Sequence, residues 1–395
     1  MDLINELLDP SLSNKTELVL KWCILGTNEI KLLADVLRIN CHLKILRIEC
    51  NTIVDQRLKY LFEALKMNNT LKILDIRASI ITDDSIEYLI EAFKTNLSLT
   101  TLSLWSNNIN SKILQKFIDI FKKNCTVSTL YLCNNNVNDL ILYHLSDVLK
   151  INFTLKILHL EYNNIYAIGA QYLAVLLEKT NEILEEIHLW GNKIGDNGVK
   201  YLAKALKTNN SLVTLNIGSN QISSIGMQYL MKSLKKNTTL KRLDLCYNAI
   251  GDEGVKYLSD TLKINTSLVF LQLGNINISN EGVKYLASSL EKNKTIKFMD
   301  LGSNNFDDQG AQYLDEALKI NTTLTKLYAF STNISLGMLS KINQKININQ
   351  INQKRLRCLQ ILCLEKINQQ GQTTEIESIN PTIYTSCMDK YDKDI

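Results

Sequence analysis

The amino-acid sequence predicts an α/β solenoid, in which a parallel β-sheet lines the concave side and α-helices cover the convex side. A unit of 28 residues recurs along the chain, and its core reads L-x-x-L-x-L-x-x-N-x-I. Later in each unit come Y-L and K-x-N-x-x-L. Counted from their first apolar residue, the units begin at Leu43, Leu71, Leu99, Val127, Leu155, Leu184, Leu212, Leu240, Leu268, Ile296 and Leu324. A fixed period of this length is typical of a solenoid.

Each unit begins with a short predicted strand. Positions 1, 4 and 6 are apolar, with polar residues between them. In one unit these positions are Leu240, Leu243 and Leu245. This alternation predicts a strand that buries one face. The residues at positions 3, 5, 7 and 8 are therefore expected on the exposed, concave face.

A polar turn and a helix follow the strand. Position 9 is asparagine in most units, as at Asn135 and Asn163, and an amide can pair turn backbone groups that would otherwise be buried alone. Position 13 carries a side chain typical of a helix N-cap, as at Asp196 and Asp252. Leucine or phenylalanine recurs at positions 19 and 23, which places both on one helix face.

The recurrent N-x-S/T triplets have the form of glycosylation acceptors. They include Asn237, Asn265, Asn293 and Asn321, which all occupy the same position of the unit. Because the repeat itself supplies the triplet, we interpret these asparagines as structural.

Strands and helices need different spacing, and this difference predicts a horseshoe. Adjacent strands lie about 4.8 Å apart, whereas adjacent helices need about 10 Å. We expect about 11 to 12 repeats, arranged as an N-terminal cap and degenerate first repeat (1–42) and a solenoid (43–351). Residues 352–367 are expected to form a C-terminal cap, either as a helix or as a degenerate strand. Residues 368–395 are polar and are expected to be disordered.

Composition narrows the class of function. The chain has 395 residues and a formal net charge of +4, so bulk charge favours neither nucleic acid nor an anionic membrane. Its nine cysteines form an odd set without a C-x-x-C motif, which predicts free thiols in a reducing compartment. The sequence shows no signal-peptide pattern and no apolar run of membrane-spanning length. We therefore expect a cytoplasmic protein that binds no membrane and no cofactor.

These motifs closely resemble the ribonuclease-inhibitor-like class of leucine-rich repeats over about residues 15–351. That class also supplies the receptor region of NOD-like immune receptors and the body of Ran GTPase-activating proteins. The resemblance implies protein recognition on the concave surface and on the strand-to-helix rim. The sequence has no G-x-x-x-x-G-K-[ST] motif, so the resemblance is to the repeat domain of a NOD-like receptor without its nucleotide-binding module.

The variable residues of the concave positions are the candidate binding site. Exposed aromatic side chains often anchor protein interfaces, although some of them could merely cover the sheet or close its ends. Phe270, Phe298, Tyr328 and Phe330 add aromatic surface near the C-terminal end. The predicted partner-binding residues are Trp105, Tyr131, His159, Glu161, Tyr162, Glu186, His188, Trp190, Asp244 and Tyr247.

Two histidines at position 5 of consecutive units form a further candidate. His159 and His188 are expected to lie about 5 Å apart, with Glu161 and Glu186 close by. Such a set could bind zinc or form a hydrogen-bonding patch in an interface. We favour the patch and predict no metal site.

Concave charges are mixed, which argues against a groove for nucleic acid. The bases are Arg47, Arg77, Arg242 and Lys326, and the acids are Glu49, Asp75, Glu161, Glu186, Asp244 and Asp300.

The sequence predicts a non-enzymatic scaffold or sensor that binds a protein partner as a monomer. It contains no recognised catalytic motif. The alternative is a GTPase-activating protein that resembles the Ran activator and acts through an arginine such as Arg47 or Arg77. The strongly acidic tail expected of such a protein is missing, because the C-terminal acids are interspersed with Lys390 and Lys393.

Overall fold

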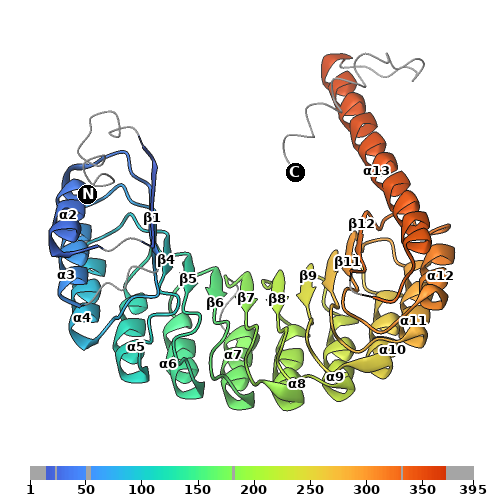
Figure 1. The fold of residues 1–395 in the computed structure, drawn as a ribbon, viewed down its shortest axis with the longest axis horizontal. Coiled ribbons are helices and arrows are strands. Elements are labelled where there is room, and N and C mark those ends of the chain that lie inside the picture. The colour runs from blue at the N-terminus through green and yellow to red at the C-terminus, as the bar shows by residue number, and fades with distance from the viewer. Residues whose placement is uncertain (1–14, 23–24, 50–54, 180–182, 331, 371–395) are drawn as a thin grey trace.

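The molecule is a horseshoe, with strands along its inner side and helices along its outer side (Figure 1). The computed structural model describes residues 15–22, 25–49, 55–179, 183–330 and 332–370. Within these ranges, twelve parallel strands form one sheet and follow each other in chain order. The predicted fold class, a leucine-rich-repeat solenoid, is confirmed.

Strands and helices alternate throughout the described residues. The strands are β1 (Glu17–Lys21), β2 (Ile45–Glu49), β3 (Ile73–Arg77), β4 (Thr101–Ser103), β5 (Thr129–Tyr131), β6 (Ile157–His159), β7 (Glu186–His188), β8 (Thr214–Asn216), β9 (Arg242–Asp244), β10 (Phe270–Gln272), β11 (Phe298–Asp300) and β12 (Lys326–Tyr328). The helices are α2 (Thr27–Ile39), α3 (Asp55–Leu65), α4 (Asp83–Phe93), α5 (Ser111–Ile118), the 3₁₀ helix η2 (Asp119–Lys122), α6 (Asp139–Leu149), α7 (Ala167–Lys179), α8 (Gly195–Leu206), α9 (Ser224–Leu234), α10 (Gly251–Leu262), α11 (Asn280–Leu290), α12 (Asp308–Ala317) and α13 (Leu336–Gln370).

The register of the sheet aligns identical repeat positions. Leu130 pairs with Leu158, and Leu215 pairs with Leu243. The one 29-residue step keeps this alignment, since His159 pairs with His188. A side chain at a given position therefore lies beside its equivalents in both neighbouring units.

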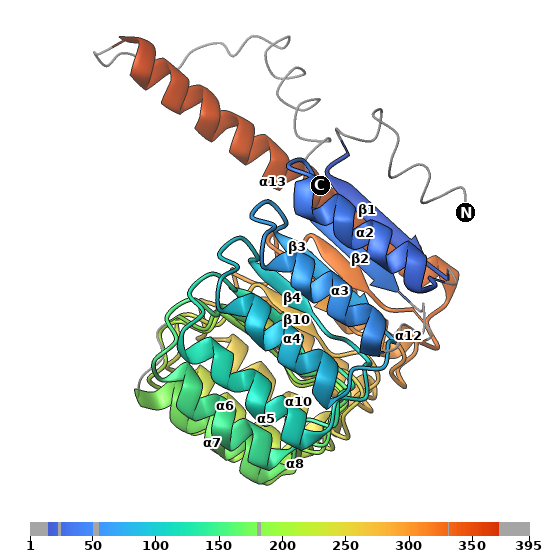
Figure 2. The same cartoon turned by 90° about the vertical axis from the view of Figure 1, so that its left-hand side faces the viewer.

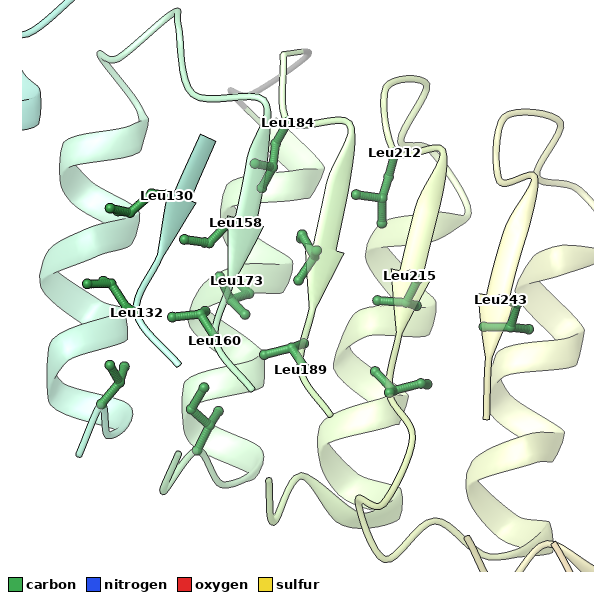
Figure 3. Packing of buried hydrophobic residues seen from close by; sticks show 14 of the residues in the cluster. Leu130, Leu132, Leu158, Leu160, Leu173, Leu184, Leu189, Leu212, Leu215 and Leu243 are labelled. Carbon is green, nitrogen blue, oxygen red and sulfur yellow. The ribbon is translucent and has the colours of Figure 1, made fainter. Parts of the chain in front are cut away.

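The core is a column of leucines between the sheet and the helices. Leu130, Leu158, Leu215 and Leu243 point from their strands toward the helices (Figure 3). Each of these leucines is at most 1% exposed. Full burial of one such side chain contributes about 1.5–3 kcal/mol. The apolar positions of the sequence pattern thus form one continuous core.

The predicted asparagine ladder connects turns of neighbouring units wherever position 9 is asparagine in the described residues. Asn163 Oδ1 accepts bonds from the backbone N–H groups of Asn135 (2.9 Å) and Val137 (3.0 Å) in the preceding unit. Its Nδ2 donates to the carbonyls of Leu132 (3.0 Å) and Leu160 (2.9 Å). One buried amide therefore satisfies backbone groups of two units.

The asparagines of the N-x-S/T triplets are structural, as predicted. Asn237 is 5% exposed, and its Nδ2 donates to Leu206 O in the preceding unit at 2.8 Å. Its Oδ1 accepts from the N–H groups of Thr239 and Leu240. Asn265 repeats this arrangement with Leu234 O at 2.7 Å.

The predicted N-cap position was wrong by one residue at α6 and α9, and by two residues at α8 and α10, where Ile194 and Ile250 are the N-caps. Asn138 and Ser223, at position 12, cap their own helices by accepting from Ile141 N and Ile225 N.

Position 13 is already helical, and its side chain reaches the following unit. Asp196 Oδ1 accepts from Ser223 N (2.8 Å) and Gly226 N (3.0 Å) at the start of α9. Because adjacent helices pack side by side, a carboxylate in the first turn of one lies beside the free N–H groups of the next. Asp55 and Asp83 belong to the same predicted series, but their side chains lie outside the described residues.

Lysines and tyrosines form a regular series on the convex face. Lys200 Nζ lies 5.3 Å from the ring centroid of Tyr229, and Lys256 Nζ lies 5.9 Å from that of Tyr285. In each pair the tyrosine belongs to the unit after the lysine. Such cation–π contacts contribute about 0.5–1 kcal/mol at exposed sites.

The solenoid has atypical units at both ends. At the N-terminal end, β1 pairs with β2 and α2 buries Ile30, Leu33 and Leu37. At the other end, the long helix α13 extends away from the repeats (Figure 2). Its first half buries Ile342 and Ile346 against the last repeat.

Helix α13 runs through the expected boundary between residues 351 and 352. The segment 352–367 is therefore helical rather than a strand, and it continues the helix that covers the last repeat. The expected tail lies outside the described residues from residue 371 onward. No helix in the described part of the chain is long and apolar enough to cross a membrane.

Candidate functional site

The concave rim holds residues with a left-handed backbone at position 8. The angle φ is 55° at Tyr162 and 58° at Tyr247, a region that residues other than glycine rarely adopt. A bond to the following unit holds each one, because Tyr162 N donates to Trp190 O (2.8 Å) and Tyr247 N donates to Gly274 O (2.9 Å). Both side chains extend into solvent and are 54% and 56% exposed.

Three aromatic rings form a stack across strands β5, β6 and β7. The rings of Tyr131 and His159 have centroids 4.0 Å apart and planes 10° apart. His159 and His188 continue the stack at 4.1 Å and 11°. The sheet imposes this arrangement, because all three residues occupy position 5 of consecutive units.

Carboxylates hold the two histidines. His159 Nδ1 lies 2.9 Å from Glu161 Oε1, and His188 Nε2 lies 3.2 Å from Glu186 Oε2. Because an ionised carboxylate only accepts hydrogen bonds, each of these ring nitrogens carries a proton. Burial lowers the pKa of His188, and the nearby His159 adds to this effect. His188 is therefore neutral at physiological pH.

Glu161 connects this stack to a buried thiol. Cys133 Sγ donates to Glu161 Oε2 at 2.9 Å. Burial alone would raise the pKa of Glu161, but the hydrogen bond and charge of His159, together with the bond from Cys133, lower it below its ordinary value. Burial, and then the charge of Glu161, raise the pKa of Cys133. The pair is thus a carboxylate beside a protonated thiol, which is a poor nucleophile.

Trp190 and Tyr247 form a second aromatic contact, between β7 and β9. Their ring centroids lie 5.4 Å apart with planes at 70°. One unit lies between the units of Trp190 and Tyr247, and in that unit the position of Trp190 is occupied by Gly218. A Cβ atom at Gly218 would lie 2.2 Å from the Trp190 ring. The absence of a side chain there allows the indole to lie across the intervening strand.

Trp105 lies apart from this pair. The Arg77 guanidinium is 5.3 Å from the centroid of its ring. Arg77 in turn pairs with Asp75, at 2.9 Å from Nε to Oδ1 and 2.8 Å from Nη2 to Oδ2. The sequence placed both tryptophans in one candidate segment, whereas in the structure each has its own aromatic or cationic neighbour.

Asp244 lies in a shallow groove of ≈ 340 Å³ beside the histidines. Its Oδ1 accepts from Cys246 N at 3.0 Å, and burial raises its pKa. Thr214 lines the same groove, and its buried Oγ1 has no hydrogen-bond partner among the described residues. This buried hydroxyl is therefore an unsatisfied polar group beneath the groove, which is unfavourable for the folded state.

One group in the described residues offers potential metal ligands. Ligand atoms of His159, Glu161 and His188 lie within 4.8 Å of one another. The two rings are nearly parallel, so their nitrogen lone pairs do not converge on one point. Binding zinc at about 2.0–2.1 Å from nitrogen would require an imidazole to rotate and to give up its present stacking.

Two further concave features lie outside the set of predicted partner-binding residues. Trp22 carries the same left-handed backbone, with φ of 54°, and is 80% exposed. Near the other end, Arg242 lies over Phe270, which stacks on Phe298. The aromatic residues at position 3 of consecutive units were the available signal for this second feature.

Family comparisons identify leucine-rich repeats in the chain. A model described as the TMOD/LMOD leucine-rich domain matches residues 162–251. A second model, described as a leucine-rich repeat, matches residues 292–314. No curated protein matches the chain.

Three solved structures illustrate the similarity. Leiomodin-1 actin-binding site 2 is 18% identical over 48% of this chain and 95% of its own, with a TM-score of 0.34. An internalin from Listeria monocytogenes is 19% identical over 87% of this chain and 93% of its own, with a TM-score of 0.48. A chain from the yeast Rad7–Elc1 complex is 18% identical over 79% of this chain and 85% of its own, with a TM-score of 0.44.

Proposed function

We propose that the protein is a non-enzymatic scaffold or sensor that binds a folded protein on its concave face. The observation that carries the proposal is the rigid aromatic surface formed by the Tyr131–His159–His188 stack and the Trp190–Tyr247 pair. Tyrosine and tryptophan are enriched among residues that dominate binding energies. Their fixed orientation reduces the entropy that ordering side chains would cost on binding.

The extent of this surface suits a protein partner. It crosses strands β5 to β9, which span about 19 Å at the usual strand spacing. A standard interface covers about 800 Å² on each partner. The carboxylates of Glu161, Glu186 and Asp244 supply polar groups between the rings. Aromatic anchors with dispersed polar groups are typical of such interfaces.

The proposal also includes the class of leucine-rich repeat and the location of the protein in the cell. The strand–turn–helix unit of 28 residues, which is the basis for the resemblance to ribonuclease-inhibitor-like repeats, supports that class and the NOD-like receptor type. A cytoplasmic location is supported by the free thiols of Cys41, Cys125, Cys133, Cys246 and Cys358. We propose a monomer, with no nucleic acid or membrane as partner.

Activation of a GTPase, the alternative function, has less support than binding of a protein on the concave face. An arginine that acts on a nucleotide must be able to leave its own neighbours. Arg77 is held by Asp75 and lies over Trp105, and Arg47 pairs with Glu17 at 3.2 Å. Neither guanidinium extends freely from the rim.

The test compares captured proteins between variants of the full chain. Trp190→Ala combined with Tyr247→Ala removes one aromatic contact of the surface. Leu140→Ala combined with Tyr143→Ala removes exposed apolar side chains from helix α6 on the convex face. Circular dichroism and urea denaturation establish that both variants fold.

We expect a partner that is captured by the wild type and by the α6 variant but is lost with the Trp190/Tyr247 variant. Its affinity, measured with purified proteins, should fall at least about 30-fold, since two anchor residues typically contribute 2 kcal/mol or more. If every captured protein bound the Trp190/Tyr247 variant at full affinity, this concave assignment would be wrong.

A further inference from the structure

A basic groove lies at the edge of the sheet where strands β9 to β12 begin. It has a volume of ≈ 470 Å³ and is lined by Val213, Lys241, Arg242, Val269, Phe270, Lys297, Phe298, Thr325 and Lys326. Four of these residues are cationic and none is acidic. The groove adjoins the aromatic surface described above, because Arg242 and Phe270 also line the neighbouring groove that contains His188.

The cations of the basic groove have no counter-ion in the part of the chain that the structure describes. Among the described residues, Lys241, Arg242, Lys297 and Lys326 have no carboxylate oxygen within salt-bridge distance. The neighbouring units explain why Lys241 and Lys297, the two lysines at position 2, lack an ion-pair partner. Lys156, at the same position of an earlier unit, pairs with Glu185 of the next unit at 2.7 Å. The equivalent residues are valines on either side of Lys241, and Val269 and Thr325 on either side of Lys297, none of which can neutralise a lysine.

The aromatic rings of the basic groove already cover one another. The Arg242 guanidinium carbon lies 3.9 Å from the centroid of Phe270, and Phe270 stacks on Phe298 at 3.9 Å and 6°. Tyr328 contacts Phe298 edge to face at 5.2 Å. Single-stranded nucleic acid binds by stacking bases on free ring faces. The faces of Phe270 are taken, so the groove favours a different anionic ligand.

We propose that the basic groove binds an acidic, extended segment of a protein partner, with carboxylates on either side of an aliphatic side chain. This inference rests on the proposed function, in that the partner is a protein. Carboxylates would pair with Lys241 and Lys297, and the aliphatic side chain would contact Val269 and the edge of Phe270 between them.

The spacing of the two lysines sets the sequence pattern of the segment. Lys241 and Lys297 are two units apart, which corresponds to about 10 Å along the sheet edge. A peptide in the polyproline II conformation rises about 3.1 Å per residue, so side chains three positions apart lie on one face about 9 Å apart. The matching pattern therefore has glutamate or aspartate at every third position with leucine or valine between them.

The test measures anisotropy of a fluorescein-labelled peptide in which glutamate recurs at every third position and leucine follows each glutamate. A second peptide carries glutamine in place of glutamate. The full-length protein is compared with Lys241→Glu/Lys297→Glu. Lys200→Glu/Lys256→Glu makes the same change in net charge on the convex helices, and a short oligodeoxythymidylate serves as competitor.

We expect the wild type and the convex variant to bind the glutamate peptide equally. The groove variant and the glutamine peptide should each weaken binding at least about tenfold, because pairs of opposite charges become pairs of like or neutral groups. Binding should also weaken as salt rises, since exposed charges are screened. Equal binding by the groove variant, or tighter binding of the oligonucleotide than of the peptide, would overturn the proposal.

The result of the peptide experiment does not depend on the aromatic side chains Trp190 and Tyr247. Trp190→Ala/Tyr247→Ala leaves all residues of the basic groove in place, so this variant should bind the peptide as the wild type does. Loss of peptide binding in the groove variant alone would therefore support the acidic segment even if protein capture did not depend on Trp190 and Tyr247.

Discussion

The imidazole rings of His159 and His188 lie face to face, 4.1 Å apart, although the two residues are 29 positions apart in the chain. Tyr131 extends the stack on the other side of His159. The stack follows directly from the parallel register, which places position 5 of each unit beside the same position of its neighbours. It forms a continuous rigid strip in the centre of the candidate site.

The stack should contribute to stability. His159→Ala removes two ring contacts and the hydrogen bond to Glu161, and we expect it to lower the free energy of unfolding by about 2 kcal/mol. His159→Phe keeps a ring and should recover part of this loss. Urea denaturation measures both, and equal losses for the two variants would show that stacking contributes nothing.

The asparagine ladder should be a major source of stability. Asn163→Ala leaves the N–H groups of Asn135 and Val137 buried without their acceptor. We expect a loss of about 3 kcal/mol in the free energy of unfolding. The neighbouring Asn164 is exposed and bonds through its side chain to Lys193 Nζ, so Asn164→Ala is the matched control and should change stability little. Similar losses in the two variants would contradict the role of the ladder.

The bond between helices explains why glycine follows the N-cap at several units. A Cβ at Gly226 would lie 2.5 Å from Asp196 Oδ1 and 2.8 Å from Ile222 Cγ2. Gly226→Ala should therefore destabilise the protein by about 1–3 kcal/mol, despite the helix propensity of alanine. Gly337→Ala is the control, because no atom lies within 4 Å of its Cβ, and it should be neutral or stabilising. Thermal denaturation of the two variants distinguishes these effects, and a stabilising Gly226→Ala would refute the close contact.

Asp244 should make stability depend on pH. Burial raises its folded-state pKa above the ordinary value of 3.8, so the folded state retains a proton that the unfolded state releases. Stability from this group therefore falls as pH rises from the unfolded pKa through the folded pKa. Asp244→Asn should be more stable than the wild type at pH 7, and the difference should shrink as pH falls toward 3.8. Urea denaturation across this range tests the sign, and a difference that grew on acidification would contradict it.

Thiol reactivity should separate the described cysteines into two groups. Cys41 and Cys125 are exposed, whereas Cys133, Cys246 and Cys358 are buried, and burial raises the pKa of Cys133 and Cys246. Because the thiolate is the reactive form, iodoacetamide at pH 8 should label Cys41 and Cys125 and leave the buried cysteines unmodified in the native state. Peptide mass spectrometry with and without urea checks this, and rapid native labelling of Cys133 would show that its site opens.

Interactions between like positions could be predicted from the sequence. The period places Asn135 beside Asn163 and His159 beside His188, and both pairs interact in the structure. Interactions between unlike positions could not be predicted in this way. Asp196 was expected to cap its own helix, but it bonds to Ser223 and Gly226 of the next unit. That choice depends on how closely two helices approach, which the repeat alone does not specify.

The sequence by itself determined the solenoid, its register and the residues that face the concave side, because a fixed period of apolar positions can be buried in only one way along the whole chain. Tertiary structure alone decided which concave side chains act together. Trp190 reaches Tyr247 because Gly218 has no side chain in the space that the indole occupies, and Arg77 is held by Asp75 over the ring of Trp105. These contacts depend on side-chain volume and orientation in neighbouring units, which differ from unit to unit while the period stays constant.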